Sequence, residues 1–335
     1  MSYPFTEKTI RSTFSKLKKL KVFIVGDAMI DQYWRGQIDR ISPEAPVPII
    51  SVNQKDARPG GAANVALNCR ALGAEVYLFT VLGKDHAAKE LIQQLQIEKI
   101  HTEGCLQSAD RVTTIKTRVI AKNQQVFRLD EENHEDLSVK DEHRFIDTCL
   151  RAIQIEKPDI LIFEDYNKGV LKLNVIEKII NHCKHVGVLT AVDPKKNNFL
   201  SYRQVDLFKP NLKEVREALN IQLAVVNEKH LKQVHEKLQN MLNHKITLIT
   251  LSELGVFVQQ EKQSHLYPAH FRNISDVSGA GDTVIAVAAA LYAIHKDISM
   301  MAYISNIAGG LVCEEAGVVP INVTKLLEEA LSKIK

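Results

Sequence analysis

Short apolar segments rich in β-branched residues alternate along this chain with longer amphipathic segments, and this alternation restricts the fold more than any other feature. Such segments are typical of buried strands, and the stretches between them place apolar residues at helical spacing. Strands separated by helices favour a parallel sheet covered on both faces. We expect strands at 22–25, 76–81, 160–163, 188–192, 207–208 and 246–251, and helices at 61–72, 87–95, 173–185 and from residue 212.

Two stretches interrupt this rhythm, at about 35–57 and 111–130. Both alternate polar and apolar residues, which is typical of strands with one solvated face. Asn123 and Gln124 provide a turn between two strands of the second stretch. We therefore predict a doubly wound, mostly parallel α/β fold with a small inserted antiparallel β lid. Residues 1–19 are expected to form an N-terminal extension and residues 20–335 one domain.

Charge, hydropathy and cysteine content exclude several classes of protein. The 335 residues include 43 basic and 40 acidic side chains, a net charge of +3, so we expect no nucleic-acid partner and no membrane partner. The longest uninterrupted apolar run, Val284–Ile294, is shorter than the about 20 residues of a transmembrane helix. The N-terminus lacks the apolar core of a signal peptide. Five scattered cysteines are typical of reduced thiols, and we expect a cytoplasmic protein.

The segment DVSGAGD at 276–282, followed by an apolar run, carries the strongest chemical signal. Glycines let a backbone approach an anion closely, and the free N–H groups of a first helical turn point toward it. A carboxylate beside an anion site is useful as the acceptor of a proton from a hydroxyl that attacks a phosphoryl group. Asp282 could have that role. It could equally be an acidic first-turn residue that stabilises the helix.

Two familiar phosphate-binding motifs are incomplete. Val284 stands where a dinucleotide fingerprint that begins at Gly279 needs glycine, and Asp85 follows Gly83-Lys84 where a P-loop needs Ser or Thr. Both observations argue against the two common nucleotide-binding folds. A nucleotide-dependent oxidoreductase is therefore the weakest alternative.

Polar residues near the start of the chain are suited to hydroxyl groups. Gly60 and Gly61 open the first long helix, and Asn64 follows with an amide that both donates and accepts hydrogen bonds. Asp31 comes shortly after the first strand, and ligands of such sheets bind outside the carboxyl ends of the strands. The alternatives are a tight loop-to-helix turn for the glycines and a solvated loop acid for Asp31.

Asn211 and Glu214 follow the short strand at 207–208 and lie three residues apart. Their side chains therefore share one side of a first helical turn. One interpretation is an N-cap and its capping-box partner. The other is a pair that orders hydrated Mg²⁺ and nucleotide phosphates.

In this order, the three segments resemble the ribokinase-like (PfkB) family of carbohydrate kinases, over about residues 20–320. The resemblance implies the ribokinase-like fold, ATP and Mg²⁺ as cofactors, and room for a monovalent cation. It implies that Asp282 is the catalytic base. It assigns the anion hole to the amides of Gly279, Ala280 and Gly281, ATP binding to Asn211, Glu214, Thr250, Gly255, Gly279 and Gly281, and sugar binding to Asp31, Gly60, Gly61 and Asn64. Ser252 departs from the glycine that many members have, which leaves the backbone path there open.

Within that family, the runs GDAMIDQYWRGQIDRISPEAPVPI, NQQVFRLDEE, DYNKG and DPKK are similar to kinases of heptose 7-phosphate. The similarity implies phosphorylation of the anomeric 1-hydroxyl of D-glycero-D-manno-heptose 7-phosphate, on the route to ADP-heptose and lipopolysaccharide core. Such kinases are often fused to an adenylyltransferase, and we expect here the stand-alone form with a separate partner enzyme. The alternatives are a kinase of ribose, fructose or fructose 1-phosphate, and a non-catalytic sugar-binding relative.

The distal phosphate of such a substrate needs a cation. Lys168, after the strand at 160–163, is the first choice, and Arg118 and Arg128 are placed on facing arms of one hairpin. The further candidates are Arg35, Arg40, Arg58 and Arg111. Each could instead be a surface charge. A lid sheet has edges that must be covered. In relatives of the family that this chain resembles, the lids of two subunits often cover each other in a dimer. We therefore also expect a homodimer through the lid.

Overall fold

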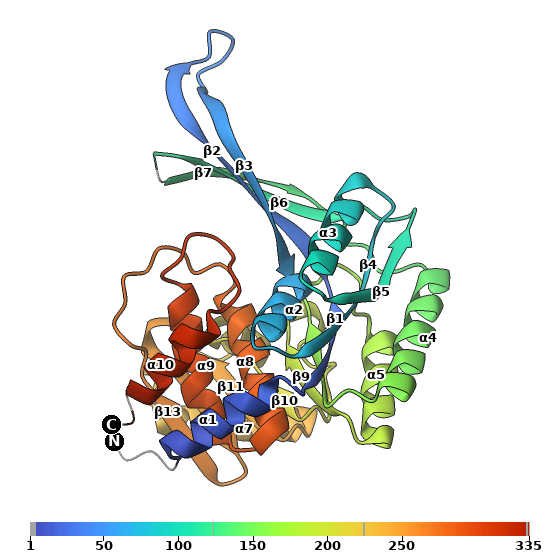
Figure 1. Ribbon diagram of the computed structural model, residues 1–335, viewed down its shortest axis with the longest axis vertical. Helices are drawn as coiled ribbons and strands as arrows, with labels where there is room; N and C mark the ends of the chain where they lie inside the picture. Colours follow the sequence, from blue (N-terminus) through green and yellow to red (C-terminus); the bar gives the residue numbers. More distant parts are fainter. Residues whose placement is uncertain (1–4, 123, 224, 333, 335) are drawn as a thin grey trace.

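The computed structural model describes residues 5–122, 124–223, 225–332 and 334. Within them, one sheet has the strand order β13-β12-β11-β10-β9-β8-β1-β4-β5 (Figure 1). Its strands are β1 (Lys21–Gly26), β4 (Glu75–Gly83), β5 (His101–Ser108), β8 (Ile160–Glu164), β9 (Leu189–Asp193), β10 (Leu207–Phe208), β11 (Ile246–Thr250), β12 (Val256–Gln260) and β13 (Gln263–Tyr267). The strands from β11 to β5 are parallel, and β12 and β13 add an antiparallel edge.

Helices cover both faces of this sheet, because its strands present apolar side chains in both directions. In β1, Val22 and Ile24 belong to one buried cluster, whereas Phe23 and Val25 belong to the other. The helices are α1 (Glu7–Leu17), α2 (Ala62–Ala71), α3 (His86–Ile97), α4 (Val139–Glu156), α5 (Leu173–Val186), α6 (Leu212–Leu219), α7 (Glu228–Leu242), α8 (Ala280–His295), α9 (Ile298–Val312) and α10 (Val323–Ser332). None of these described helices is long and apolar enough to cross a membrane.

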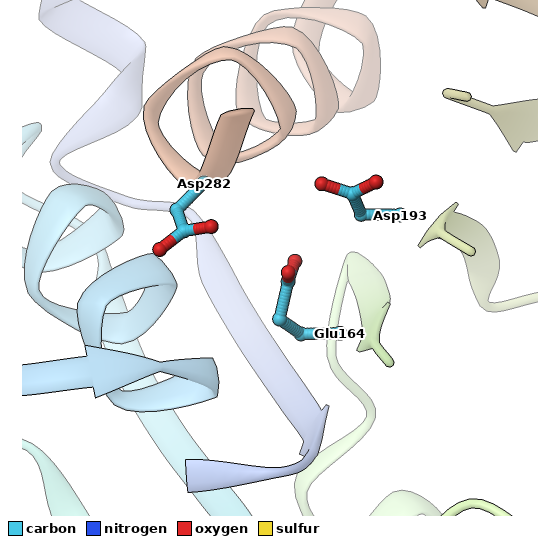
Figure 2. Close-up of side chains that lie close together, drawn as sticks. All are labelled: Glu164, Asp193 and Asp282. Atoms are coloured by element: carbon cyan, nitrogen blue, oxygen red, sulfur yellow. The ribbon is translucent and has the colours of Figure 1, made fainter. Parts of the chain in front are cut away.

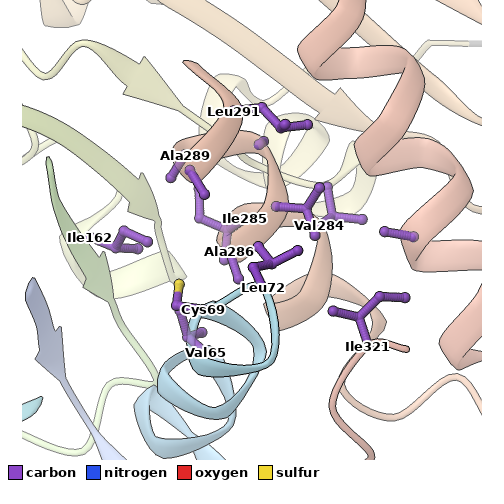
Figure 3. Packing of buried hydrophobic residues seen from close by; sticks show 14 of the residues in the cluster. Val65, Cys69, Leu72, Ile162, Val284, Ile285, Ala286, Ala289, Leu291 and Ile321 are labelled. Carbon is purple, nitrogen blue, oxygen red and sulfur yellow. The ribbon is translucent and has the colours of Figure 1, made fainter. Parts of the chain in front are cut away.

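Helix α8 lies at the centre of the first cluster and is buried on all sides (Figure 3). Val65 and Cys69 of α2 pack against its Ile285 and Ala286 side. On the α9 side, a Cβ atom at Gly309 would lie 2.7 Å from Cγ2 of Val284, so glycine permits this close helix contact. The dense packing fixes the first turn of α8, which is the turn that carries the DVSGAGD glycines.

The lid is a second sheet with the order β3-β2-β6-β7, and its first hairpin projects from the body (Figure 1). The strands are β2 (Ala28–Ile41), β3 (Pro48–Gly61), β6 (Thr114–Ala121) and β7 (Gln124–Glu131). Each hairpin is antiparallel, as predicted, but β2 pairs with β6 in parallel. The predicted turn includes Asn123, which lies outside the described residues. The doubly wound fold with an inserted lid is confirmed.

Candidate active site

Asp282 lies in the first turn of α8, where the chain enters the helix through Gly279 at φ +78°. Its carboxylate is 4% exposed. The Asn64 Nδ2 donates to Oδ2 at 2.8 Å, and the Tyr166 hydroxyl donates to Oδ1 at 2.7 Å. Burial raises the pKa of the Asp282 carboxyl, and these two hydrogen bonds oppose that rise. A carboxylate held this way can accept a proton from a neighbouring hydroxyl.

Asn64 lies on α2 and is itself held by a second amide. Asn68 Nδ2 donates to the Asn64 side-chain oxygen at 3.1 Å and to its backbone oxygen at 2.9 Å. The Asn68 oxygen accepts from Thr283 and from the backbone of Ile321. This network orients the Asn64 amide so that its nitrogen faces Asp282. The structure thus gives Asn64 a contact with Asp282 that sequence reasoning did not predict.

Two further acids, Glu164 and Asp193, lie beside Asp282 and were missed by sequence reasoning (Figure 2). One carboxylate oxygen of each residue lies within 4.8 Å of those of the other two. Both terminate neighbouring parallel strands, β8 and β9, and that position at the carboxyl edge was the signal available in the sequence. Burial, followed by the charges of Asp193 and Asp282, raises the pKa of Glu164 well above its ordinary value.

Lysine side chains offset part of this negative charge. Lys209 Nζ lies 2.8 Å from Asp193 Oδ2, and both residues are buried. A Cβ atom at Gly281 would lie 3.5 Å from that carboxylate and 3.8 Å from Lys209 Nζ. The glycine turn, the ion pair and Asp282 therefore form one group of contacts. An anion at the start of α8 would have a buried ammonium group near it.

The anion hole predicted from Gly279, Ala280 and Gly281 is altered in one respect. The Ala280 N–H donates to the Val277 carbonyl at 3.3 Å, so a turn already uses this amide. Gly279 needs its glycine, because φ is +78° and a Cβ atom would lie 2.8 Å from Asn64 Nδ2. The amides of Gly279 and Gly281 are the better candidates for the anion hole.

Asp31, Gly60 and Gly61 are brought together where β2 and β3 pair beside the body of the protein. Asp31 lies opposite Arg58 and is 4% exposed. A Cβ atom at Gly60 would lie 2.0 Å from Asp31 Oδ2, so a larger residue there would displace the Asp31 carboxylate. The alternative of a solvated loop acid is wrong, because Asp31 is a buried residue of β2 whose Oδ1 binds Arg118. All three nevertheless lie on the paired strands β2 and β3, and β3 leads directly into α2, which carries Asn64.

Asn211 and Glu214 form the capping box that one of the two interpretations predicted. Asn211 Oδ1 accepts from the Glu214 N–H at 2.8 Å, and Glu214 Oε2 accepts from the Asn211 N–H at 2.8 Å. The other Glu214 oxygen, Oε1, accepts from Lys195 Nζ at 3.0 Å. Since Lys195 follows β9, the cap of α6 is tied to the acid group at the strand ends.

Thr250 and Gly255 lie on either side of a short turn after β11. Thr250 ends the strand, and its N–H donates to the Pro210 carbonyl, next to Asn211. Gly255 has φ +95°, and a Cβ atom there would lie 2.0 Å from the Tyr267 carbonyl. Ser252 adopts φ +53°. The backbone therefore takes the left-handed path that glycine would favour, although the residue is serine.

The predicted phosphate cations are placed on the lid side of the site, and each has an acidic neighbour. Lys168 is 8% exposed and its Nζ lies 2.7 Å from Glu132 Oε2. Arg118 and Arg128 face each other across β6 and β7, as predicted. Arg118 binds Asp31, as noted above. Arg128, half exposed, pairs with Asp130 at 2.8 Å.

The remaining cation candidates have other contacts. Arg58 donates to the Val318 carbonyl at 3.0 Å, and Arg111 donates to the carbonyls of Glu135 and Lys168. Arg35 and Arg40 lie on the projecting strand β2. These contacts give Arg58 and Arg111 roles in holding loops.

Comparison with known proteins places this geometry in a family. A model of the pfkB family of carbohydrate kinases matches residues 19–325. The bifunctional protein HldE of Psychromonas ingrahamii is 36% identical over 327 residues, which are 97% of this chain and 66% of that protein. The HldE of Syntrophotalea carbinolica is 34% identical over 321 residues, 95% of this chain and 64% of that protein. The chain thus spans about two thirds of the length of these relatives.

Solved structures share the fold at lower sequence identity. Phosphofructokinase-2 from Escherichia coli in complex with potassium superposes with a TM-score of 0.77 at 15% identity, covering 94% of this chain and 99% of that one. Arabidopsis thaliana ribokinase complexed with ribose and ATP gives 0.70 at 18%, covering 92% and 99%. Given the family match over 19–325 and relatives above 30% identity along nearly the whole sequence, the chain belongs to the pfkB family of carbohydrate kinases.

Proposed function

We propose that this kinase transfers the γ-phosphoryl group of ATP to the anomeric 1-hydroxyl of D-glycero-D-manno-heptose 7-phosphate. The observation that carries the proposal is the buried Asp282 carboxylate, held by two donors at the mouth of a helix opened by glycines. The heptose acceptor is supported by the similarity of the run at 26–49 to heptose 7-phosphate kinases. The product would be heptose 1,7-bisphosphate, a precursor for ADP-heptose and lipopolysaccharide core.

In this reaction Asp282 removes the proton from the 1-hydroxyl as its oxygen bonds to the γ-phosphorus. The bond from that phosphorus to the β–γ bridging oxygen breaks, and ADP leaves with the electron pair. In this proposal the amides of Gly279 and Gly281 stabilise the negative charge that develops on the transferred group, and the Lys209 ammonium group, which lies near Gly281, assists them. Each of these groups is fixed before the substrate binds.

The carboxylate oxygens at this edge of the sheet fit Mg²⁺, which prefers oxygen ligands and retains waters. Among the described residues, both Glu164 oxygens and Asp193 Oδ1 are buried without a hydrogen-bond partner. Asn211 and Glu214, tied up in the capping box, would act through water. The metal supplies neutralisation of phosphate charge when bound. We therefore propose that Glu164 and Asp193 support the metal together with the Asn211–Glu214 pair.

Lys168 remains our candidate for the distal phosphate. Glu132 binds both Lys168 and Lys116 at 2.7 Å. Burial raises the pKa of Glu132, but the two lysines outweigh it and lower the pKa to about 2. A phosphate dianion could take the place of Glu132 between the two ammonium groups. The contact joins lid strand β6 to the loop after β8, so binding there would hold the lid against the body.

We also propose a homodimer through the lid. Strands β3 and β7 are the two edges of the lid sheet. On β7, Val126, Phe127 and Leu129 are between 38% and 47% exposed. A second copy that covers this apolar edge would remove it from water.

The test of the proposed activity is mass detection of a bisphosphate after incubation with ATP and heptose 7-phosphate. Ribose, fructose and fructose 1-phosphate are assayed beside it by coupled detection of ADP. Turnover of heptose 7-phosphate at the highest kcat/KM supports the proposal. Preference for another sugar would reassign the acceptor, and absence of turnover with every sugar would favour a non-catalytic relative.

A further inference from the structure

We propose that Tyr166 is a positioning residue of this kinase: its hydroxyl holds the base Asp282 in the orientation that receives the acceptor proton. The inference rests on the proposed role of Asp282. It adds a residue that neither the sequence motifs nor the comparisons assign. Tyr166 lies in the DYNKG segment, directly after the buried strand β8.

The backbone of Tyr166 is fixed independently of its side chain. Asp27 is buried at the end of β1, and one of its oxygens accepts from the N–H groups of Tyr166 at 2.8 Å and Lys168 at 3.1 Å. Its other oxygen accepts from the Val170 N–H at 3.2 Å. These three hydrogen bonds to one carboxylate fix the backbone of the loop. The position from which the Tyr166 side chain extends is therefore fixed as well.

The Tyr166 hydroxyl and the Asn64 amide donate to the two different oxygens of the Asp282 carboxylate. The hydroxyl lies 2.7 Å from Asp282 Oδ1, while Asn64 lies 2.8 Å from Oδ2. The two donors come from different elements, α2 and the loop after β8, so together they restrict rotation of the carboxylate. A general base must present its lone pair within hydrogen-bond reach of the acceptor hydroxyl. Loss of one donor would let the carboxylate turn away from that position.

The ring also connects the base to the nucleotide side of the site. Lys195 Nζ lies 5.1 Å from the centre of the Tyr166 ring, and it binds Glu214 at 3.0 Å. Glu214 closes the capping box with Asn211. One continuous set of contacts thus runs from Asp282 through Tyr166 and Lys195 to the start of α6. The base and the capping box of α6 are thus connected through one tyrosine and one lysine.

The hydrogen bond from Tyr166 determines the sign of the expected effect. The titratable groups that face Asp282 are Glu164 from β8, Asp193 from β9, Lys195 after β9 and Lys209 after β10, and Tyr166→Phe changes none of them. The Tyr166 hydroxyl donates to Asp282, and this hydrogen bond favours the charged form of Asp282. Removal of that bond leaves burial less opposed, and the base then ionises only at higher pH.

The experiment compares Tyr166→Phe with wild type in the full chain, using ATP and heptose 7-phosphate. Phenylalanine keeps the ring beside Lys195 and removes only the hydroxyl. We expect kcat at neutral pH to fall about 10- to 100-fold, as for loss of a hydrogen bond to a charged group. We also expect the acid limb of the kcat–pH profile to move to higher pH. The KM for ATP should stay unchanged.

Tyr202→Phe is the matched control. Tyr202 is buried and donates to Asp165 Oδ2 at 2.6 Å, one residue before Tyr166 in the loop, but its hydroxyl contacts a different carboxylate. The control variant should leave the acid limb in place. If Tyr166→Phe is unfolded by circular dichroism, 3-fluorotyrosine at position 166 replaces it. That more acidic phenol donates more strongly and should move the limb to lower pH.

The outcomes separate this inference from the proposed function. Wild-type protein without turnover on any sugar would remove the proposed function itself. Active wild type with an unmoved acid limb in Tyr166→Phe, or an equal shift in Tyr202→Phe, would overturn the role of Tyr166 alone. A shift confined to position 166 supports it, because a purely structural residue would lower activity without changing the pH at which the base ionises.

Discussion

Replacing Asp282 with asparagine tests the central feature of the site with almost no change in shape. The new amide can direct its oxygen toward Asn64 Nδ2, which lies 2.8 Å from the present Oδ2. Its nitrogen can then donate to the Tyr166 hydroxyl, because a phenol accepts as well as donates. Asn64 keeps its orientation, since its own oxygen accepts from Asn68. The variant therefore loses the proton acceptor while a hydrogen bond on each side is retained.

The substitution affects rate and stability by different amounts. Loss of a positioned general base costs about 10²–10⁴-fold in rate, or about 3–5 kcal/mol of barrier. Exchange of a charged hydrogen-bond acceptor for a neutral one weakens the contacts with Asn64 and Tyr166. This loss of stability is offset in part, because burial of the charged carboxylate is unfavourable, as its raised pKa shows, and asparagine is neutral. We expect Asp282→Asn to abolish nearly all turnover with a small change in unfolding free energy.

The assay couples ADP release to NADH oxidation, with ATP binding measured by calorimetry and stability by urea denaturation. Asp206→Asn is the control, since Asp206 is also buried and hydrogen-bonded but lies at the opposite edge of the sheet, before β10. It should lose stability and retain kcat. If Asp282→Asn kept more than about a tenth of wild-type kcat while binding ATP normally, the general-base role would be wrong.

Three further predictions concern other parts of the molecule. Lys168→Met should raise the KM for the sugar phosphate more than that for ATP, while Lys172→Met, which breaks an ion pair elsewhere, should change neither; equal KM values in all three proteins would remove Lys168 from the site. Burial, with a smaller contribution from His235, lowers the pKa of His244 to about 3. Between the ordinary pKa of 6.5 and this lowered value, the unfolded chain therefore binds a proton at His244 that the folded chain does not. The wild type should therefore lose about 2 kcal/mol of unfolding free energy between pH 7 and 5, and His244→Gln should lose correspondingly less in urea denaturation; equal losses would refute this. Phe127→Asp should convert a dimer to a monomer in sedimentation velocity, and an unaffected dimer would exclude β7 from the interface.

Local sequence patterns predicted most of the fold because they record burial directly. The strand expected at 160–163 is β8, and the helix expected at 173–185 is α5. The pairing of β2 with β6 could not be read this way. Alternation shows that one face of each hairpin is solvated, but it contains no information on how one hairpin lies beside another. That arrangement depends on where β1 ends before β2 and where β5 ends before β6.

The same limit explains what was missed in the site. Asp282 was predictable because glycines mark its helix start within the sequence. Glu164 and Asp193 end apolar strands without any such mark, and only the parallel pairing of β8 and β9 places them side by side. Tyr166 was hidden for a related reason. Its partner is 116 residues away, so no local pattern reports the contact.

Asn211 and Glu214 show that structural and functional interpretations of one motif need not compete. The capping box fixes both side chains at the end of β10, and the second Glu214 oxygen is left for Lys195. Burial lowers the pKa of Lys195, but the carboxylates of Asp193 and Glu214 raise it above its ordinary value, so the lysine stays charged beside the acids. The cap that begins α6 thus also holds a cation beside the acids at the ends of β8 and β9. Removing Glu214 would disturb the start of α6 and the ion pair with Lys195 together, so that substitution changes folding and catalysis at once. Tyr166→Phe removes a single hydroxyl and leaves the capping box intact.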